Sequence, residues 1–156
     1  AASMFYAISY SIMAVAAFGS IILLSRSGFE AGEINDFKGL WVKSPGFAFL
    51  LLFVIVSLAG IPPFLGFFAK LQVIVAALQG GYQWLAIWAV VCAVIGAFYY
   101  LKLIRVMFFE KPESDSIAIN ADIHLRAAFI VNASALLVLG IFSNSILSWC
   151  IKAFPS

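Results

Sequence analysis

Long apolar runs separated by charged segments are the dominant pattern along this chain. A membrane-spanning helix needs about 20 apolar residues, which at about 1.5 Å each cover about 30 Å of hydrocarbon. The pattern therefore predicts an all-α integral membrane protein, with 1–156 as a single membrane segment. Four spanning helices are expected, at 3–25, 46–79, 84–108 and 127–151, with charged loops at 26–45 and 109–126.

The second run, 46–79, is too long for one straight helix, because as a continuous helix it would measure about 50 Å. Near its centre lie Gly60, Pro62 and Pro63. Proline has no backbone N–H and its ring clashes with the preceding turn. We therefore expect one discontinuous, tilted span, broken at 60–63 within the membrane. Broken helices of this kind recur where transporters bind ions.

Composition agrees with a membrane protein and excludes several other classes. The chain is 65% hydrophobic and only 10% charged, and its mean hydropathy is +1.11. A net charge of +2 is too small and too dispersed to predict nucleic acid binding. Cys92 and Cys150 lie in different apolar runs without metal-ligand spacing. We therefore expect no metal, haem or iron–sulfur site in the chain, and it contains no flavin or nucleotide motif.

The basic residues predict how the helices are oriented. Most of them fall in or beside the two charged loops, namely Arg26, Lys38, Lys43, Lys102, Arg105, Lys111 and Arg126. The turn between the second and third runs is uncharged, and Lys152 lies at the far end of the fourth. Because cytoplasmic loops are enriched in Lys and Arg, both charged loops are expected in the cytoplasm and both termini outside it.

Lys70 is the principal candidate site residue, because it lies inside the broken run, close to the middle of the membrane. An ammonium at that depth costs several kcal/mol unless it is paired, hydrated or neutral. One interpretation is a titratable relay for protons or ions, with Gly60, Pro62 and Pro63 as a hinge or access point. The other is a structural lysine beside a simple kink. Since no acidic residue lies inside a predicted span, we expect any acidic partner of Lys70 in a segment outside these residues or in another chain.

Two weaker candidates lie towards the cytoplasmic side. Lys102 could provide proton access there, although with Tyr99, Tyr100 and Arg105 it is more typical of an interfacial belt. His124 could take part in proton entry because of its near-neutral pKa, but a solvent-exposed loop residue is the commoner case.

Polar side chains within the spans, such as Ser57 and Gln72, could line a file of water, whereas hydrogen bonding between helices is their more common use.

Three stretches carry a resemblance to a known family: Tyr10–Gly19, the central motif Ser57–Lys70 followed by Leu71, and Phe98–Lys102. They resemble the antiporter-like membrane subunits of respiratory complex I, and most closely the subunit N type of bacterial NADH:quinone oxidoreductases. The resemblance covers nearly the whole chain, and its central motif is highly specific.

The resemblance implies a fourteen-helix fold, of which this chain matches the last four helices. It places Lys70 on the broken helix as the terminal proton relay. The family's other relay residues have no counterpart here, so the chain would hold only part of a proton path. Quinone, FMN and iron–sulfur clusters would be bound by other subunits. The implied partners are the other complex I membrane subunits, the remaining helices of the same subunit and the lipid of a bacterial inner membrane, with the termini periplasmic.

Two other functions stay open at this point. One is a subunit of a cation/proton antiporter or a membrane-bound hydrogenase, which belongs to the same superfamily. The other is a structural scaffold segment of a membrane complex, in which Lys70 only pairs with a neighbour.

Overall fold

The computed structural model describes residues 1–25, 33–112 and 123–153, and within these ranges the regular structure is entirely helical. The elements in chain order are α1 (Ala2–Leu24), the 3-10 helix η1 (Ile34–Phe37), α2 (Leu40–Lys43), α3 (Pro45–Ala59), α4 (Leu65–Gln79), α5 (Gln83–Phe109), α6 (Ile123–Ile141) and α7 (Ser143–Ala153).

Three of these helices, α1, α5 and α6, are long and apolar enough to cross a membrane. The all-helical membrane class predicted from the sequence is therefore confirmed. Helices α3 and α4 are apolar but contain only 15 residues each. At about 1.5 Å per residue, each is too short to cross a bilayer alone. That they form a single crossing together stays a prediction.

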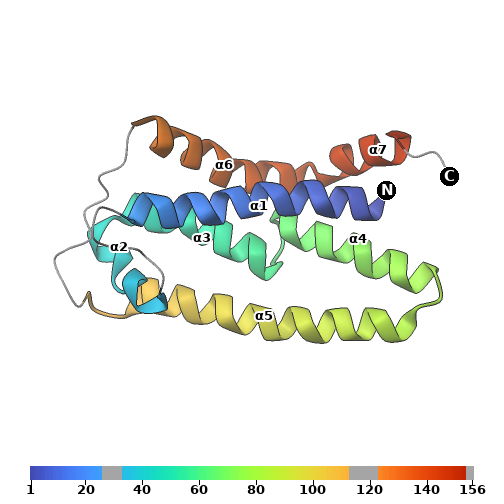
Figure 1. Cartoon of the computed structure of the whole chain (residues 1–156), viewed down its shortest axis with the longest axis horizontal. Helices are drawn as coiled ribbons and strands as arrows, with labels where there is room; N and C mark the ends of the chain where they lie inside the picture. Colours follow the sequence, from blue (N-terminus) through green and yellow to red (C-terminus); the bar gives the residue numbers. More distant parts are fainter. Residues whose placement is uncertain (26–32, 113–122, 154–156) are drawn as a thin grey trace.

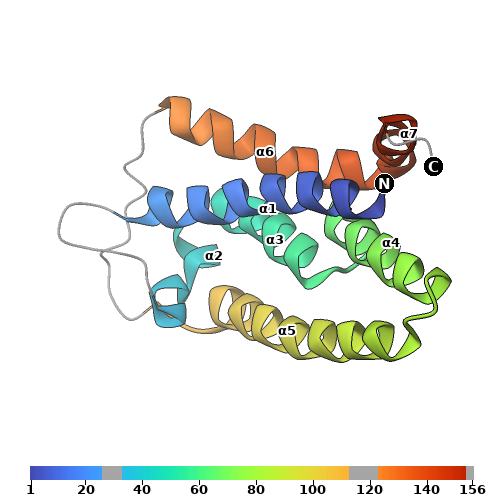
Figure 2. The same ribbon diagram turned by 45° about the vertical axis from the view of Figure 1, so that its right-hand side comes forward.

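The broken pair α3–α4 lies between the other long helices. Figure 1 shows α1 and α6 side by side, with α5 on the opposite side and α3 followed by α4 in the middle, and Figure 2 agrees from a second direction. Helix α1 contacts α4, α6 and α3, whereas α5 packs against α3 and α4. The helices on either side of the interruption are therefore packed against other helices, whereas Ile61, Pro62 and Pro63 within it are exposed.

The helix ends and the connections between helices lie at two opposite ends of this bundle. The end of α1, helix α2, the end of α5 and the start of α6 meet at one end (Figure 1). The N-terminus, the turn from α4 to α5 and helix α7 lie at the other. Helices α3 and α4 run one after the other from the first end towards the second.

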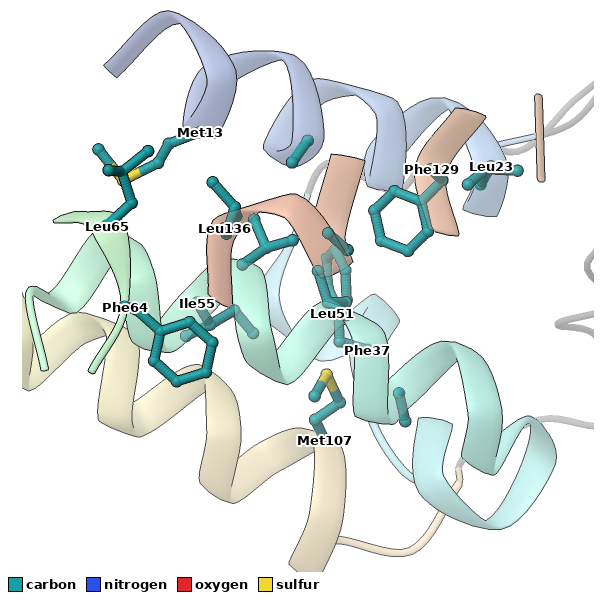
Figure 3. Close-up of a cluster of buried hydrophobic side chains, with 14 of the residues drawn as sticks. Met13, Leu23, Phe37, Leu51, Ile55, Phe64, Leu65, Met107, Phe129 and Leu136 are labelled. Carbon is teal, nitrogen blue, oxygen red and sulfur yellow. The ribbon is translucent and has the colours of Figure 1, made fainter. Parts of the chain in front are cut away.

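A continuous set of buried side chains joins the helices, including Met13, Leu51, Leu65, Met107 and Leu136 (Figure 3). All five are at most 3% exposed. Within lipid, such contacts stabilise a bundle through close packing rather than through exclusion of water. Helix α5 is the least covered of the three long helices, so its outer face is open to lipid or to further helices.

The fourth predicted span differs from the structure. We expected one helix over 127–151, but α6 begins earlier, at Ile123, and ends at Ile141, and α7 turns away from it (Figure 2). The sequence Ser143-Asn144-Ser145 follows the break, and these side chains compete with helix-interior hydrogen bonding. Parts of the two predicted loops, 26–32 and 113–122, lie outside the described residues.

Candidate functional site

The interruption between α3 and α4 begins with a glycine. Gly60 ends α3 in the left-handed region at φ 81°, and its N–H donates to the carbonyls of Val56 and Ser57. The N–H of Ile61 also donates to the Val56 carbonyl. Thus the last backbone donors before the prolines turn back onto α3 and close its final turn.

Pro62 and Pro63 determine which backbone carbonyls at the end of α3 lack a hydrogen-bond donor from the backbone. In an α-helix the carbonyl of one residue accepts from the N–H four positions later. The carbonyls of Leu58 and Ala59 would therefore need donors at positions 62 and 63, where proline has none. The double proline leaves a pair of acceptors at the end of α3.

Lys70 supplies the missing donors. Its Nζ atom donates to the Leu58 carbonyl oxygen at 2.8 Å and to the Ala59 carbonyl oxygen at 3.1 Å. The ammonium also lies at the C-terminal end of α3, where the helix dipole favours positive charge. Lys70 therefore caps the helix that precedes it, from a position on the helix that follows.

Ser57 makes the converse contact. Its side chain is fully buried, and its Oγ atom accepts a hydrogen bond from the N–H of Gly66, at 3.2 Å, in the first turn of α4. Ser57, on α3, thus caps the start of α4, and Lys70, on α4, caps the end of α3. We call this segment, with its two caps, the cross-capped break.

Glycines allow the backbones to approach closely here. A Cβ atom on Gly66 would overlap the Ser57 carbonyl oxygen, and one on Gly140 of α6 would overlap the Pro63 carbonyl oxygen. A Cβ atom on Gly60 would lie 3.1 Å from Lys70 Nζ. The three glycines therefore permit close approach of α4 to α3, of α6 to the interruption, and of the Lys70 side chain to the end of α3.

Lys70 is half-buried and lines two cavities. One, of about 360 Å³, lies between α1, α4 and α5 and includes Tyr6, Tyr10, Cys92 and Tyr100. The other, of about 380 Å³, lies between the break and α5 and is lined mainly by aliphatic side chains. The ammonium is therefore held by carbonyls while facing space on two sides.

The remaining candidates lie elsewhere. Lys102 is exposed on α5, and His124 is exposed in the first turn of α6. Among the described residues, neither contributes to the two cavities that Lys70 lines. Tyr100, which the sequence placed in an interfacial belt, lines the first cavity instead.

The structure shows two contacts of Lys70 that the sequence analysis did not foresee, the hydrogen bonds to the Leu58 and Ala59 carbonyls. An acidic partner outside this chain stays a prediction. Within the described residues, no three His, Cys, Asp or Glu side chains gather as a metal site.

Comparison with known proteins agrees with this architecture. Residues 1–96 match the family described as NADH:quinone oxidoreductase/Mrp antiporter, TM. The chain belongs to this family. It is 54% identical over 154 residues to NADH-quinone oxidoreductase subunit N of Xanthomonas euvesicatoria pv. vesicatoria (strain 85-10), covering 99% of this chain and 32% of that protein. It is 52% identical to the subunit N of Azoarcus sp. (strain BH72) over 149 residues, covering 96% of this chain and 30% of that one.

A solved structure is also similar. The match is to respiratory complex I from Thermus thermophilus with bound aureothin, with a TM-score of 0.81 and 27% identity, covering 94% of this chain and 33% of the matched chain. The resemblance inferred from the three motifs is thus confirmed. This member of the NADH:quinone oxidoreductase/Mrp antiporter family spans about a third of the length of the relatives it matches.

Proposed function

We propose that this chain is part of a proton-translocating membrane subunit of NADH:quinone oxidoreductase, and that Lys70 is one station of its proton path. Quinone reduction elsewhere in the complex would drive changes in the protonation of Lys70. Quinone, FMN and iron–sulfur clusters would be bound by other subunits, and the remaining helices of the same subunit would complete the path.

The observation that carries this proposal is the position of the Lys70 ammonium. It is held by the Leu58 and Ala59 carbonyls at an interruption between two apolar helices, and it lines cavities on two sides. An ionisable group with neutral partners is not bound to one charge state by a fixed counter-ion. An ionisable residue inside a membrane span is a functional-site hypothesis by default.

We further propose that α3 and α4 form one discontinuous crossing. The two helices run in succession along the same direction as their long neighbours (Figure 1). Together they contain enough residues for about 45 Å of helix, sufficient for a tilted crossing. The charge pattern would place the loops at 26–45 and 109–126 in the cytoplasm and both termini in the periplasm of a bacterial inner membrane.

Replacement of Lys70 by Met in the full-length subunit, within the assembled complex, tests the relay. The measurement is proton pumping in inside-out vesicles, alongside NADH oxidation. We expect pumping per NADH to fall while the complex stays assembled. The variant also loses two hydrogen bonds to a charged group, so we expect a lower stability by about 1–3 kcal/mol.

Lys152→Met is the matched control, because Lys152 is exposed on α7 and is not a candidate for the proton path. It should leave pumping unchanged. A Lys70→Met complex that assembles and pumps with full coupling would contradict the relay.

The structure also favours a second candidate, a scaffold role, because the Lys70 ammonium satisfies two orphan carbonyls. In that case Lys70→Met would lower thermal stability without lowering pumping in the complexes that remain assembled. A cation/proton antiporter or membrane-bound hydrogenase subunit is a further alternative, since the family description covers Mrp antiporters. Sodium-dependent proton exchange without a quinone would identify an antiporter.

A further inference from the structure

The acceptors at the end of α3 form a cation-binding arrangement in their own right. Two adjacent backbone carbonyls, those of Leu58 and Ala59, converge on a single positively charged atom, Lys70 Nζ. In membrane proteins, backbone carbonyls and the C-terminal ends of broken helices are the groups that coordinate monovalent cations.

The carbonyl pair owes its existence to the prolines rather than to Lys70. Because positions 62 and 63 lack N–H groups, both carbonyls are deprived of their helical partners whatever side chain stands at position 70. The end of the α3 dipole adds negative potential at the same place. Removing the ammonium would therefore leave the acceptors in position without donors.

The surroundings indicate which cations fit. Within the described residues, the hydrogen bonds of the ammonium go to carbonyl oxygens and not to a carboxylate. Divalent cations are generally bound with carboxylates, so a ligand set of neutral oxygens favours a single positive charge. Gly60, whose missing Cβ atom would lie 3.1 Å from Nζ, leaves room for a compact head group.

There is also room for a cation to enter. Lys70 lines cavities of about 360 Å³ and about 380 Å³ on two sides of its side chain. Shortening this side chain would join the carbonyl pair to that space.

We propose that the Leu58 and Ala59 carbonyls form a seat for a compact monovalent cation, and that Lys70 is the tethered occupant of this seat. When the side chain is shortened, a free primary ammonium ion of matching length takes its place. This inference goes beyond the proton relay and does not require that Lys70 release its proton.

The test uses the full-length subunit in its assembled complex with Lys70→Ala. This substitution removes the equivalent of n-propylammonium, so radiolabelled n-propylammonium is the probe, and equilibrium dialysis is the measurement. We expect one saturable binding site for n-propylammonium per subunit in Lys70→Ala. The wild type should not bind it, because the Lys70 side chain already occupies the site. Lys70→Met should also not bind, because an uncharged side chain of similar length fills the space.

Two controls distinguish a cation-binding site from a cavity that accepts any molecule of similar size. Unlabelled n-propylammonium should displace the label, whereas n-propanol, which has the same carbon skeleton without charge, should not. Lys102→Ala, a lysine truncation at an exposed position of α5, should behave like the wild type. Equal displacement by n-propanol, or equal binding in Lys102→Ala, would overturn the proposal.

Absence of saturable binding in an assembled Lys70→Ala complex would overturn it too. If that variant does not assemble, Lys70→Ala is prepared again with n-propylammonium present throughout expression and purification. Recovery of assembly with n-propylammonium but not with n-propanol supports the seat, and no recovery overturns it. Proton pumping is measured on the same samples. Binding of n-propylammonium by a Lys70→Ala complex that still pumps with full coupling upholds the seat and contradicts the relay. A pump-defective Lys70→Ala complex that binds no n-propylammonium contradicts the seat and agrees with the relay.

Discussion

Two interruptions in the described part of the chain, the one between α3 and α4 and the one between α6 and α7, are built differently. At Phe142, between α6 and α7, the backbone satisfies itself: the N–H of Phe142 donates to the Val138 carbonyl, and the N–H of Ser145 donates to the Phe142 carbonyl, both at 3.0 Å. Phe142 itself is 60% exposed. No distant side chain is required to complete this turn.

The cross-capped break has no such local solution. Two successive prolines remove the donors for Leu58 and Ala59, and the replacement comes from Lys70, which is 12 and 11 positions away in the sequence. Ser57 completes the arrangement from 9 positions away. When prolines remove the backbone N–H donors at an interruption, side chains from other parts of the chain must bond to the free carbonyls. One of these side chains can be charged, as Lys70 is here.

Among the substitutions that test the cross-capped break, Gly66→Ala should lower the stability of the protein most. A Cβ atom there would overlap the Ser57 backbone, so α4 would have to shift away from α3. We expect a destabilisation of about 3 kcal/mol or more, measured by thermal unfolding of the full-length subunit in detergent. Gly96→Ala on α5 is the control, because no heavy atom lies within 4 Å of its Cβ position. Equal melting curves for the two variants would contradict the close approach.

Gly140→Ala tests the contact of α6 with the break. Its Cβ atom would overlap the Pro63 carbonyl oxygen, and neighbouring backbone atoms of Phe64 and Leu65 are also close. We expect a loss of about 2–3 kcal/mol in the same assay. Gly19→Ala is a suitable comparison, since its nearest neighbour, Phe129 Cδ2, would be 3.9 Å away. If both substitutions were tolerated alike, α6 would not support the break.

Ser57→Ala removes the cap of α4 without adding volume. Loss of an N-terminal cap typically costs about 1 kcal/mol, and we expect a fall in stability of that size. Ser11→Ala provides the control, because the exposed hydroxyl of Ser11 bonds only within its own helix, to the Ala7 carbonyl. A Ser57→Ala variant as stable as Ser11→Ala would show that the cap contributes nothing.

Ser148→Ala, in α7, should have the smallest effect. Its exposed hydroxyl donates to the nearby Ser145 carbonyl at 2.7 Å, a contact within one turn. We expect a change within about 0.5 kcal/mol. A loss as large as that of Ser57→Ala would remove the distinction between the two interruptions.

Much of this architecture could be predicted from the pattern of residues. The apolar runs of α1, α5 and α6 carry a strong signal because each is long and free of acidic residues. The position of the break was predictable as well, because Gly60, Pro62 and Pro63 cannot continue a helix. The short η1 and α2, in contrast, contain only four residues each, too few for a helical pattern of apolar residues to predict them.

Tertiary detail was harder to predict. The contact of Lys70 with α3 depends on how the chain turns through 60–64, which no local pattern specifies. The end of α6 at Ile141 was missed because Phe142 continues the apolar run, although the following Ser-Asn-Ser sequence was a usable signal. Orientation in the membrane was inferred from charge, and it stays a prediction.

The two caps make Ser57–Lys70 a segment of defined length. Each residue advances an α-helix by about 100°, so one insertion between Phe64 and Lys70 would turn the ammonium to another face of α4. Such an insertion would leave hydropathy almost unchanged while separating Lys70 from both carbonyls. Spacing within this segment is therefore as much a part of the site as the identity of the lysine.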